Sequence, residues 1–361
     1  MRLKVELLQE QLPVGQGALI CYPENRRYFT DFISSAGFLI VTREQALFMT
    51  DSRYIEAAQA AVPAGIEVRE SGALDAKVLQ ELKIERLSIE ASHTTIASLH
   101  RLEKVCSGIE LDTSDFLDGA IGELRAVKSR DEVEKIVRAQ RIAERALEKT
   151  LAMIRPGVTE REIALSLDFN MLSMGADGLS FETIAVTGEN SSKPHGVPGN
   201  REVRAGDFIT MDFGAVVEGY HSDMTRTVAV GSVAEEQRRV YDTVLAAQAA
   251  MLDGLRAGIT CAQADALARD VIVQAGYGDF FRHSAGHGVG LEIHEAPFEA
   301  PRSQEVLRAG NVVTAEPGIY LLGQFGVRIE DMAYITASGI ENLTQAPKEL
   351  MVLKEKWPVG A

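Results

Sequence analysis

The stretch that decides the fold reads Arg204-Ala-Gly-Asp-Phe-Ile-Thr-Met-Asp212-Phe-Gly-Ala-Val-Val-Glu-Gly-Tyr-His-Ser-Asp223-Met-Thr-Arg226-Thr. Two apolar runs flank a short turn at 217–219, and each run carries one aspartate. An ionised carboxylate is rarely buried without a partner, because desolvating the charge is costly. Asp212 and Asp223 are symmetric about the turn, so an antiparallel hairpin would place them opposite each other. We therefore predict that a cation lies between them.

An internal repeat extends this prediction to the rest of the second half. Ile154-Arg-Pro-Gly-Val-Thr159 reappears as Leu255-Arg-Ala-Gly-Ile-Thr260, and the run 203–214 reappears at 307–318. The two offsets, 101 and 104 residues, are explained by one duplication of about a hundred residues. Two copies are too few for a solenoid, so we predict an α+β domain with a pseudo-two-fold repeat.

The repeat aligns Asp212 with Glu316, a carboxylate in the same place in each copy. The second copy also contains a candidate hairpin, in which Glu316 and Glu330 are equidistant from Gly323. Four carboxylates would therefore converge if the copies pack face to face. The alternative is that each carboxylate is an exposed strand-end residue in an ordinary ion pair, but the doubled symmetry favours a shared site.

Three of the seven histidines lie in glycine-rich or proline-rich segments close to these hairpins. His195 belongs to Ser191-Ser-Lys-Pro-His-Gly-Val-Pro198, and the other two, His287 and His294, belong to Gly286-His-Gly-Val-Gly-Leu-Glu-Ile-His-Glu295. Glycine at 286, 288 and 290 is expected to let the backbone approach another group closely, for instance a substrate. A nucleotide-binding loop is the competing interpretation, but the spacing fits neither GxGxxG nor GxxxxGK[ST].

Four carboxylates and one imidazole, without a thiolate, suit two divalent ions of the Mn, Co, Fe or Zn kind. Four negative charges would also balance the charge of two such ions. Paired ions share a water, lower its pKa and stabilise a tetrahedral intermediate, which is the chemistry of hydrolysis. His195 and His294, outside the ligand set, would donate hydrogen bonds to substrate or to the developing oxyanion.

The composition limits the partners. A net charge of −15 disfavours nucleic acid and anionic membranes. Cys21, Cys106 and Cys261 are far apart and lack CxxC spacing, so we expect a reducing, cytoplasmic environment without disulfides. The first residues lack the apolar core of a signal peptide, and no run is long enough to span a bilayer.

Residues 1–121 are predicted to form one α/β domain and residues 122–361 a second, catalytic domain. Alternating strands and helices in the first part indicate a central sheet covered on its faces. Asp51 and Arg53 there fit a helix cap and a surface ion pair better than a catalytic pair. The predicted strands are 18–22, 37–42, 46–50, 66–70 and 86–90, and the predicted helices are 52–61, 73–82, 94–106, 124–153 and 160–175.

Several short sequence motifs resemble those of the "pita-bread" metallopeptidases, the family that includes methionine aminopeptidase, aminopeptidase P and prolidase. They are Ser180-Phe-Glu-Thr-Ile184, Lys193-Pro-His-Gly196, Met211-Asp-Phe-Gly214, Asp223-Met-Thr-Arg-Thr227, Gly286–Glu295, Glu316-Pro-Gly-Ile-Tyr320 and Val327-Arg-Ile-Glu-Asp331. Asn25–Phe32, Gly37-Phe-Leu39 and Thr50–Tyr54 are similar to the N-terminal domain of the creatinase/prolidase branch. The resemblance therefore covers nearly the whole chain.

The resemblance implies a ligand set and roles for the neighbouring side chains. Its metal ligands fall on Asp212, Asp223, His287, Glu316 and Glu330, and manganese is the metal that it favours. Glu316 would also act as a general base or proton shuttle. His195 and His294 would bind the scissile carbonyl or the proline end of the substrate, and Tyr220 and Arg328 would line or brace the site.

Within this family the residues favour an Xaa-Pro peptidase, and the resemblance implies a homodimer. The extra N-terminal domain disfavours methionine aminopeptidase, and the complete ligand set disfavours both creatinase and a catalytically inactive binding relative. Many short prolidases have an arginine near the position of Phe298, where this chain reads Ala296-Pro-Phe298. An aminopeptidase that releases the residue before proline is therefore favoured over a strict Xaa-Pro dipeptidase, which remains the alternative.

Overall fold

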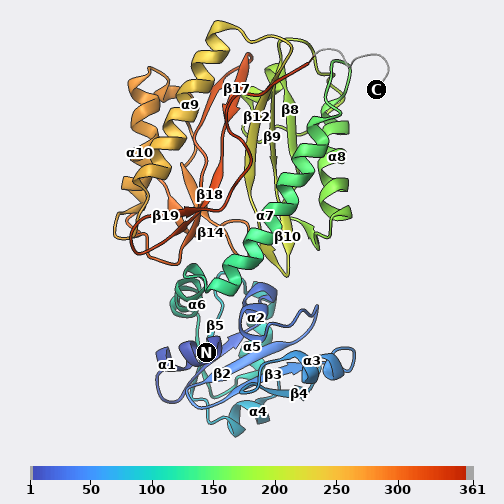
Figure 1. Cartoon of the computed structure of the whole chain (residues 1–361). Helices are drawn as coiled ribbons and strands as arrows, with labels where there is room; N and C mark the ends of the chain where they lie inside the picture. The colour runs from blue at the N-terminus through green and yellow to red at the C-terminus, as the bar shows by residue number, and fades with distance from the viewer. Residues whose placement is uncertain (1–2, 355–361) are drawn as a thin grey trace. The chain divides into compact units, whose positions relative to one another are not determined.

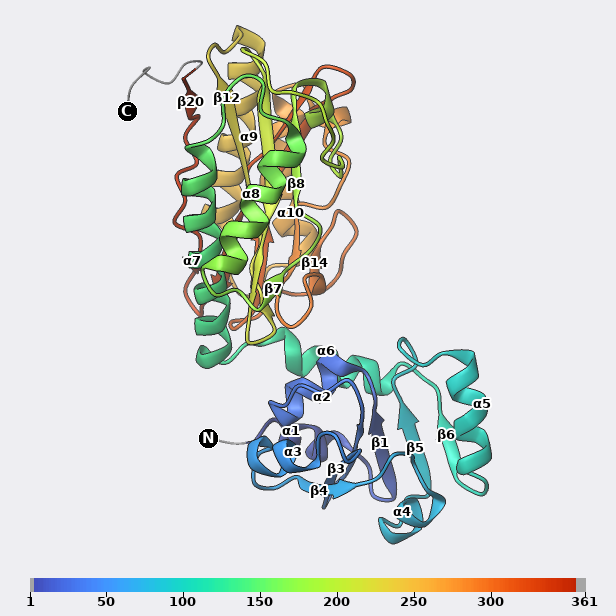
Figure 2. The ribbon, with the colours of Figure 1, turned by 90° about the vertical axis from the view of Figure 1, so that its right-hand side faces the viewer.

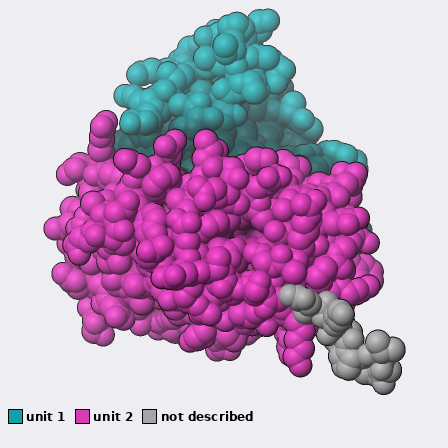
Figure 3. Space-filling model, turned by 90° about the horizontal axis from the view of Figure 1, so that it is seen from above, with its two compact units in different colours: residues 1–125 teal, residues 126–361 magenta. Residues whose placement is uncertain are grey.

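The computed structural model describes residues 3–354, and the chain divides into two compact units between Arg125 and Ala126. Figure 3 colours the two units separately. The division falls at the end of helix α6 (Phe116–Ala126), whereas the boundary between residues 121 and 122 expected from sequence falls within that helix. The limits of the functional domains therefore stay a prediction, and each unit is described by itself.

The first unit is built on one mixed six-stranded sheet, in the order β4-β3-β2-β1-β5-β6. The central strand β1 pairs antiparallel with β2 and parallel with β5. This sheet confirms the expected α/β arrangement, although strand β6 was not predicted. The strands are β1 (Gln16–Ile20), β2 (Phe38–Thr42), β3 (Ala46–Thr50), β4 (Glu67–Glu70), β5 (Arg86–Ile89) and β6 (Glu110–Asp112).

The helices of the first unit were predicted only in part. Three of them occur where the sequence pattern indicates a helix: α3 (Ile55–Ala61), α4 (Ala76–Glu81) and α5 (Ile96–Val105). Helices α1 (Lys4–Gln11) and α2 (Pro23–Thr30) were missed, and α6 was placed in the boundary region. Asp51 and Arg53 form the expected exposed ion pair at 2.6 Å, but the residue that caps α3 is Tyr54.

Helix α2 was missed because its start is stabilised by a residue far away in sequence. The carboxylate of Glu90, which is buried at the end of β5, accepts hydrogen bonds from the backbone N–H groups of Cys21 (2.6 Å) and Tyr22 (2.8 Å). It also accepts a hydrogen bond from Asn25 Nδ2 at 2.7 Å. A carboxylate at a helix N-terminus satisfies unpaired N–H groups and interacts favourably with the helix dipole.

The second unit confirms the internal repeat, because the two copies make the same local contacts. Thr159 forms an isolated β-bridge with Glu202, and Thr260, its equivalent, forms one with Val306. Thr159 caps one helix and Thr260 caps another, each within a capping box. Figures 1 and 2 show the resulting helix pairs side by side. They are α7 (Arg130–Leu151) with α8 (Glu160–Ser173), and α9 (Glu235–Gly254) with α10 (Cys261–Gln274).

Each helix pair packs mainly on strands of its own copy, although Phe208 and Ala229 of the first copy also join the core of the second pair. Helices α7 and α8 share a buried core with the sheet β20-β12-β9-β8, and α9 and α10 share a second core with β15, β16, β17 and β18. In the first copy the elements are β7 (Gly178–Leu179), β8 (Ile184–Thr187), the 3-10 helix η1 (Gly188–Ser192), β9 (Phe208–Phe213), β10 (Ala215–Val217), β11 (Tyr220–His221) and β12 (Met224–Val230). In the second they are the 3-10 helix η2 (Gly278–Phe280), β13 (Gly286–Gly288), β14 (Glu295–Glu299), β15 (Val312–Ala315), β16 (Gly318–Leu321), β17 (Phe325–Arg328), β18 (Asp331–Ile335) and β19 (Ile340–Asn342), and β20 (Val352–Leu353) ends the described chain.

The two hairpins differ in how well their registers were predicted. In the second hairpin Gly318 pairs with Arg328 and Ala315 pairs with Asp331, so Glu316 and Glu330 lie at matching positions, as expected. In the first hairpin the partner of Asp212 is Thr225, and Asp223 lies two residues before Thr225, nearer the turn. The prediction that Asp212 and Asp223 face each other directly was therefore wrong.

The turn of the first hairpin explains this shift. Its two central residues are Glu218 and Gly219, with φ angles of 48° and 75°. Val217 pairs with Tyr220 on either side of them. Two consecutive residues with positive φ are the signature of a tight two-residue turn. The turn is therefore centred one residue later than the sequence suggested, which moves the register by two.

None of the helices within residues 3–354 combines the length and the apolar character needed to cross a bilayer.

Candidate metal centre

One cavity of about 430 Å³ in the second unit brings the predicted carboxylates and imidazoles together. The hairpins supply its carboxylates, the loop after η1 supplies His195, and the segment from β13 to β14 supplies His287 and His294. Apolar side chains line another part of the wall. The lining residues are Phe181, Glu182, Thr183, Ile184, Pro194, His195, Gly196, Val197, Pro198, Asp212, Asp223, His283, Ser284, His287, His294, Phe298, Glu316, Arg328 and Glu330.

Asp223, His287 and Glu330, all buried, form a compact group that could hold a metal ion. One potential ligand atom from each of the three lies within 4.8 Å of the others. His287 Nε2 is 3.6 Å from Asp223 Oδ2 and 3.4 Å from Glu316 Oε1. The imidazole therefore lies between carboxylates that come from both copies of the repeat.

The surroundings of His287 leave Nε2 available as a ligand. Its Nδ1 is 3.1 Å from the backbone oxygen of Gly288, a distance at which Nδ1–H donates to the carbonyl. That bond fixes the tautomer and leaves the Nε2 lone pair facing the carboxylates, as is usual for metal-bound histidines. Burial lowers the pKa of His287, which favours the neutral, ligating form.

The carboxylates themselves lack partners for part of their oxygens. Asp212 Oδ1 and Glu330 Oε1 are buried without a hydrogen-bond partner within residues 3–354. Burial raises the pKa of Asp223 well above its usual value, and the neighbouring carboxylates raise it further. The pKa of Glu330 is raised for the same two reasons. Crowded, unpartnered carboxylate oxygens around a neutral imidazole fit divalent cations, which would neutralise their charge.

Arg328 is the only lysine or arginine among the described lining residues, and it is already engaged. Its guanidinium donates to Asp212 Oδ2 at 2.6 Å, to Tyr320 Oη at 2.7 Å and to Thr225 Oγ1 at 2.9 Å. Thr225 in turn donates to Glu330 Oε2 at 2.6 Å. Arg328 therefore holds one carboxylate directly and another through Thr225, which orients the carboxylates in both hairpins.

Three imidazoles besides His287 reach the cavity. His195 and His294 were predicted, and both are exposed there. His283 was missed: its Nε2 lies 3.0 Å from Tyr320 Oη, which connects it to Arg328. Burial lowers the pKa of His283 to about 3, and Arg328 adds to this shift. Its position four residues before His287, in the same segment, is the signal that sequence reasoning could have used.

The glycines at 286, 288 and 290 allow a close approach, as expected, but the group that comes close is another part of the same chain. A methyl group at Gly286 would overlap the backbone oxygen of Thr314, and one at Gly288 would overlap the backbone of Glu295 and Ala296. At Gly290 it would overlap the carboxylate of Glu295. These glycines let neighbouring parts of the same chain pass close to the strand that carries His287, so no approach of substrate is needed to explain them.

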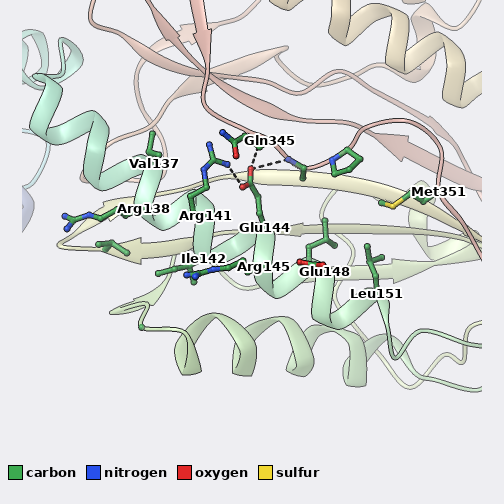
Figure 4. Close-up of a pocket in the computed structure, with 15 residues that line it drawn as sticks. Val137, Arg138, Arg141, Ile142, Glu144, Arg145, Glu148, Leu151, Gln345 and Met351 are labelled. Atoms are coloured by element: carbon green, nitrogen blue, oxygen red, sulfur yellow. Dashed lines mark hydrogen bonds and ion pairs between the residues drawn. The ribbon is translucent and has the colours of Figure 1, made fainter. Parts of the chain in front are cut away.

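A larger hollow of about 930 Å³ lies elsewhere in the second unit, along α7 (Figure 4). Its wall is mostly apolar, with side chains such as Val137, Leu151 and Met351, and its charged groups include the paired Arg141 and Glu144. Among residues 3–354, its lining includes neither a histidine nor an aspartate. The smaller cavity is therefore the candidate for chemistry.

The protein families that the chain matches are consistent with a metal site in this cavity. The family described as metallopeptidase family M24 matches residues 134–337, and the creatinase/prolidase N-terminal domain matches residues 6–127. The chain belongs to metallopeptidase family M24. It carries the N-terminal domain of the creatinase/prolidase branch, and its second unit has the pita-bread fold.

Relatives of this metallopeptidase include proteins named Xaa-Pro dipeptidase and X-Pro aminopeptidase. A Pyrococcus horikoshii protein named Xaa-Pro dipeptidase is 37% identical over 320 residues, which cover 88% of this chain and 89% of the relative. The structure of an Xaa-Pro dipeptidase from Bacillus anthracis is 41% identical and covers 97% of this chain and 99% of its own, with a TM-score of 0.93. That of an X-Pro aminopeptidase from Thermotoga maritima is 36% identical and covers 96% and 99%, with a TM-score of 0.89.

The structure brings all but one of the predicted site residues of the metallopeptidase to the cavity. The exception is Tyr220, which is not among the lining residues. Its buried hydroxyl donates to Glu132 Oε1 at 2.7 Å, on helix α7. A role of Tyr220 in lining the cavity is therefore not supported. The predicted residues that do line it are His195, Asp212, Asp223, His287, His294, Glu316, Arg328 and Glu330.

Proposed function

We propose that the chain is an Xaa-Pro aminopeptidase, which hydrolyses the bond between an N-terminal residue and proline. The observation that carries the proposal is the single cavity in which unpartnered carboxylate oxygens, a neutral imidazole and two exposed histidines converge. Family membership establishes a metallopeptidase, and relatives named for Xaa-Pro peptides support proline as the residue after the cleaved bond.

Five residues would hold two divalent ions: Asp212, Asp223, His287, Glu316 and Glu330. Their oxygen and imidazole donors suit manganese, with Co²⁺, Fe²⁺ and Zn²⁺ as alternatives. When bound, the ions would supply an activated water and Lewis-acid stabilisation of the developing negative charge.

Side chains around the ligands would handle the proton and the substrate. Glu316 lines the cavity with its Oε1 3.4 Å from His287 Nε2, where its carboxylate would be placed to exchange a proton with the attacking water. It would take a proton from the attacking water and deliver one to the departing proline nitrogen. His195 and His294, exposed in the cavity, would donate hydrogen bonds to the scissile carbonyl. Arg328 would keep Asp212 oriented.

The composition of the wall supports substrates longer than a dipeptide. A strict dipeptidase needs a group that binds the carboxylate of the terminal proline, and a free arginine or lysine would serve best. Among the described lining residues the only such group is Arg328, whose guanidinium is committed to Asp212, Tyr320 and Thr225. Phe298 and Val197 are exposed at the cavity, where a longer peptide could contact them.

The second candidate is an Xaa-Pro dipeptidase, which the names of the relatives from P. horikoshii and B. anthracis favour. The two candidates differ in one measurable ratio, kcat/KM for Xaa-Pro against Xaa-Pro-Yaa-Zaa in the presence of Mn²⁺. The aminopeptidase is expected to cleave the tetrapeptide at least as well as the dipeptide. Cleavage of the dipeptide alone would establish the dipeptidase instead.

Chelation followed by metal addition tests the chemistry itself. The stripped protein is expected to be inactive, and Mn²⁺ or Co²⁺ should restore its activity on Xaa-Pro peptides but not on matched Xaa-Ala peptides. The Asp223→Asn variant should lose activity, whereas a pure peptide-binding protein would be indifferent to that change. Equal rates with and without metal would refute the proposal.

We also propose that the enzyme is a cytoplasmic homodimer. Sedimentation of the purified protein would give its mass in solution, and fractionation of cells would give its location. A monomer, or a protein recovered outside the cytoplasm, would contradict the respective part of this proposal.

A further inference from the structure

The position of His294 depends on the loop that carries it. His294 lies in the segment between strands β13 and β14, and its ring packs edge-on against the ring of His287, with 4.4 Å between the centroids. Within residues 3–354 no hydrogen bond to the His294 ring is found. An exposed side chain without such a bond keeps its place only if the backbone beneath it is fixed.

The residue directly after His294 is fixed by a buried ion pair. Lys128 Nζ lies 2.7 Å from Glu295 Oε1, and the two side chains are only 1% and 8% exposed. The other carboxylate oxygen, Oε2, accepts a hydrogen bond from the backbone N–H of Glu292 at 3.4 Å. The absence of a side chain at Gly290 leaves room for this carboxylate. Glu295 therefore connects Lys128 with the backbone of the loop at Glu292.

Lys128 is itself held firmly. It belongs to the short connection between α6 and α7, and its backbone N–H donates to the oxygen of Gly310 at 2.8 Å. The adjoining Ala126 oxygen accepts a hydrogen bond from Asn311 Nδ2, also at 2.8 Å. On the other side Ser129 caps helix α7 within a capping box. The lysine therefore presents its ammonium group from a rigid position.

The start of the loop is fixed independently. The backbone N–H of His221, on β11 of the first hairpin, donates to the oxygen of Gly290 at 2.9 Å. The loop is thus tied to the first hairpin at Gly290 and to Lys128 at Glu295. The four residues between these ties, 291–294, have little freedom, and the last of them is His294.

We propose that the Lys128–Glu295 ion pair positions the His294 side chain in the cavity. Neither Lys128 nor Glu295 lines the cavity, so both are positioning residues that act through His294. The competing explanation is that the pair only stabilises the fold. The effect on peptide hydrolysis rests on the proposed function, whereas the effect on the orientation of His294 does not.

The kinetic test compares three variants: Glu295→Gln, His294→Ala and the double variant. Glu295→Gln keeps the size of the side chain but removes its charge, and it is expected to lower kcat/KM about 10- to 100-fold with metal content unchanged. If Glu295 acts through His294, the double variant will be no slower than His294→Ala alone, within about twofold. Effects that multiply in the double variant would overturn the proposal.

A surface ion pair offers the matched control. Arg130 Nη1 and Glu341 Oε2 are 3.0 Å apart, with side chains that are 64% and 52% exposed. Glu341→Gln makes the same chemical change as Glu295→Gln and should leave kcat/KM unaltered. Lys128→Met removes the other partner of the buried pair and should reproduce the loss of kcat/KM seen with Glu295→Gln. If Lys128→Met does not fold, Glu295→Gln alone decides.

A measurement without substrate separates this proposal from the proposed function. Histidine labelled with ¹³C in the Zn²⁺-loaded protein gives one ring signal for each residue, assigned with His294→Gln and His195→Gln. Glu295→Gln should shift or broaden the signal of His294 and leave that of His195 in place. An unchanged His294 signal would overturn the positioning role even if the enzyme cleaves Xaa-Pro peptides. A changed signal in a protein without such activity would uphold it.

Discussion

Acidification should weaken metal binding by a definite amount, because the metal displaces protons from the carboxylate cluster. In the metal-free protein, burial and mutual repulsion raise the pKa values of Asp223 and Glu330, and burial raises that of Glu316 to about 7. Each carboxyl must lose its proton before its oxygen can bind a cation. The sign follows: affinity is highest above these pKa values and falls as the pH drops through them.

The magnitude can be worked out for Glu316. A carboxyl with a pKa of about 7 is about 90% protonated at pH 6 and about 10% protonated at pH 8. This one group should therefore weaken the apparent affinity about tenfold between pH 8 and pH 6, equivalent to about 1.4 kcal/mol. Asp223 and Glu330 act in the same direction, so tenfold is the minimum.

Isothermal titration calorimetry of stripped protein with Mn²⁺, at several pH values, measures this effect. Titrations in two buffers with different ionisation enthalpies give the number of protons released. Glu316→Gln is the comparison: it will bind metal more weakly at every pH, but its affinity should change less between pH 8 and pH 6. An affinity that is equal at pH 6 and pH 8, with no buffer-dependent heat, would refute the reasoning.

Three further predictions concern the framework of the site. Arg328→Met removes the support of Asp212, and kcat/KM in a steady-state assay should fall about 100-fold, as expected for a displacement of about 1 Å. Asp331→Asn breaks a buried pair with Arg226 (2.7 Å) and should cost about 3–5 kcal/mol in chemical denaturation. Burial alone would raise the pKa of Asp331, but Arg226 and Lys348 hold it below its usual value. The stability that Asp331 contributes is therefore present above the pKa of the unfolded state and is lost as the pH falls through the pKa of the folded state. The denaturant midpoint of the wild type should drop below about pH 4, and that of Asp331→Asn should change less. In thermal unfolding, Gly286→Ala should destabilise by about 1–3 kcal/mol because the methyl group meets the backbone of Thr314. Gly119→Ala, in open space on α6, should stabilise by about 0.5–1 kcal/mol in the same assay.

The catalytic half was largely predictable because the sequence repeats itself. The duplication relates Asp212 to Glu316, and the structure places both at one cavity. The register of the second hairpin follows from symmetry about Gly323, since an antiparallel pair is fixed by its turn. In the first hairpin the same reasoning failed by two residues, because the positive φ angles of Glu218 and Gly219 determine where the turn is centred. A shift of the turn by one residue therefore changes the register of the whole strand.

Interactions between distant residues could not be predicted. Helix α2 begins where it does because Glu90 accepts its N-terminal N–H groups, and His283 reaches the cavity because Tyr320 bonds to its ring. The role of the glycine at 290 depends on the carboxylate of Glu295, whose own position requires Lys128. Each case needs the coordinates of two segments at once, which a pattern along one segment does not contain.

The buried guanidinium of Arg226 has a consequence for the order of assembly. From β12 it donates to the backbone oxygen of Glu330 at 2.5 Å and to Asp331 Oδ1 at 2.7 Å, and it also reaches the oxygens of Ala346 and Pro347. The two hairpins are thus joined by protein atoms alone. The conformational entropy of bringing the carboxylates together is lost during folding. The two copies therefore dock without the cations, which then enter a preorganised cage.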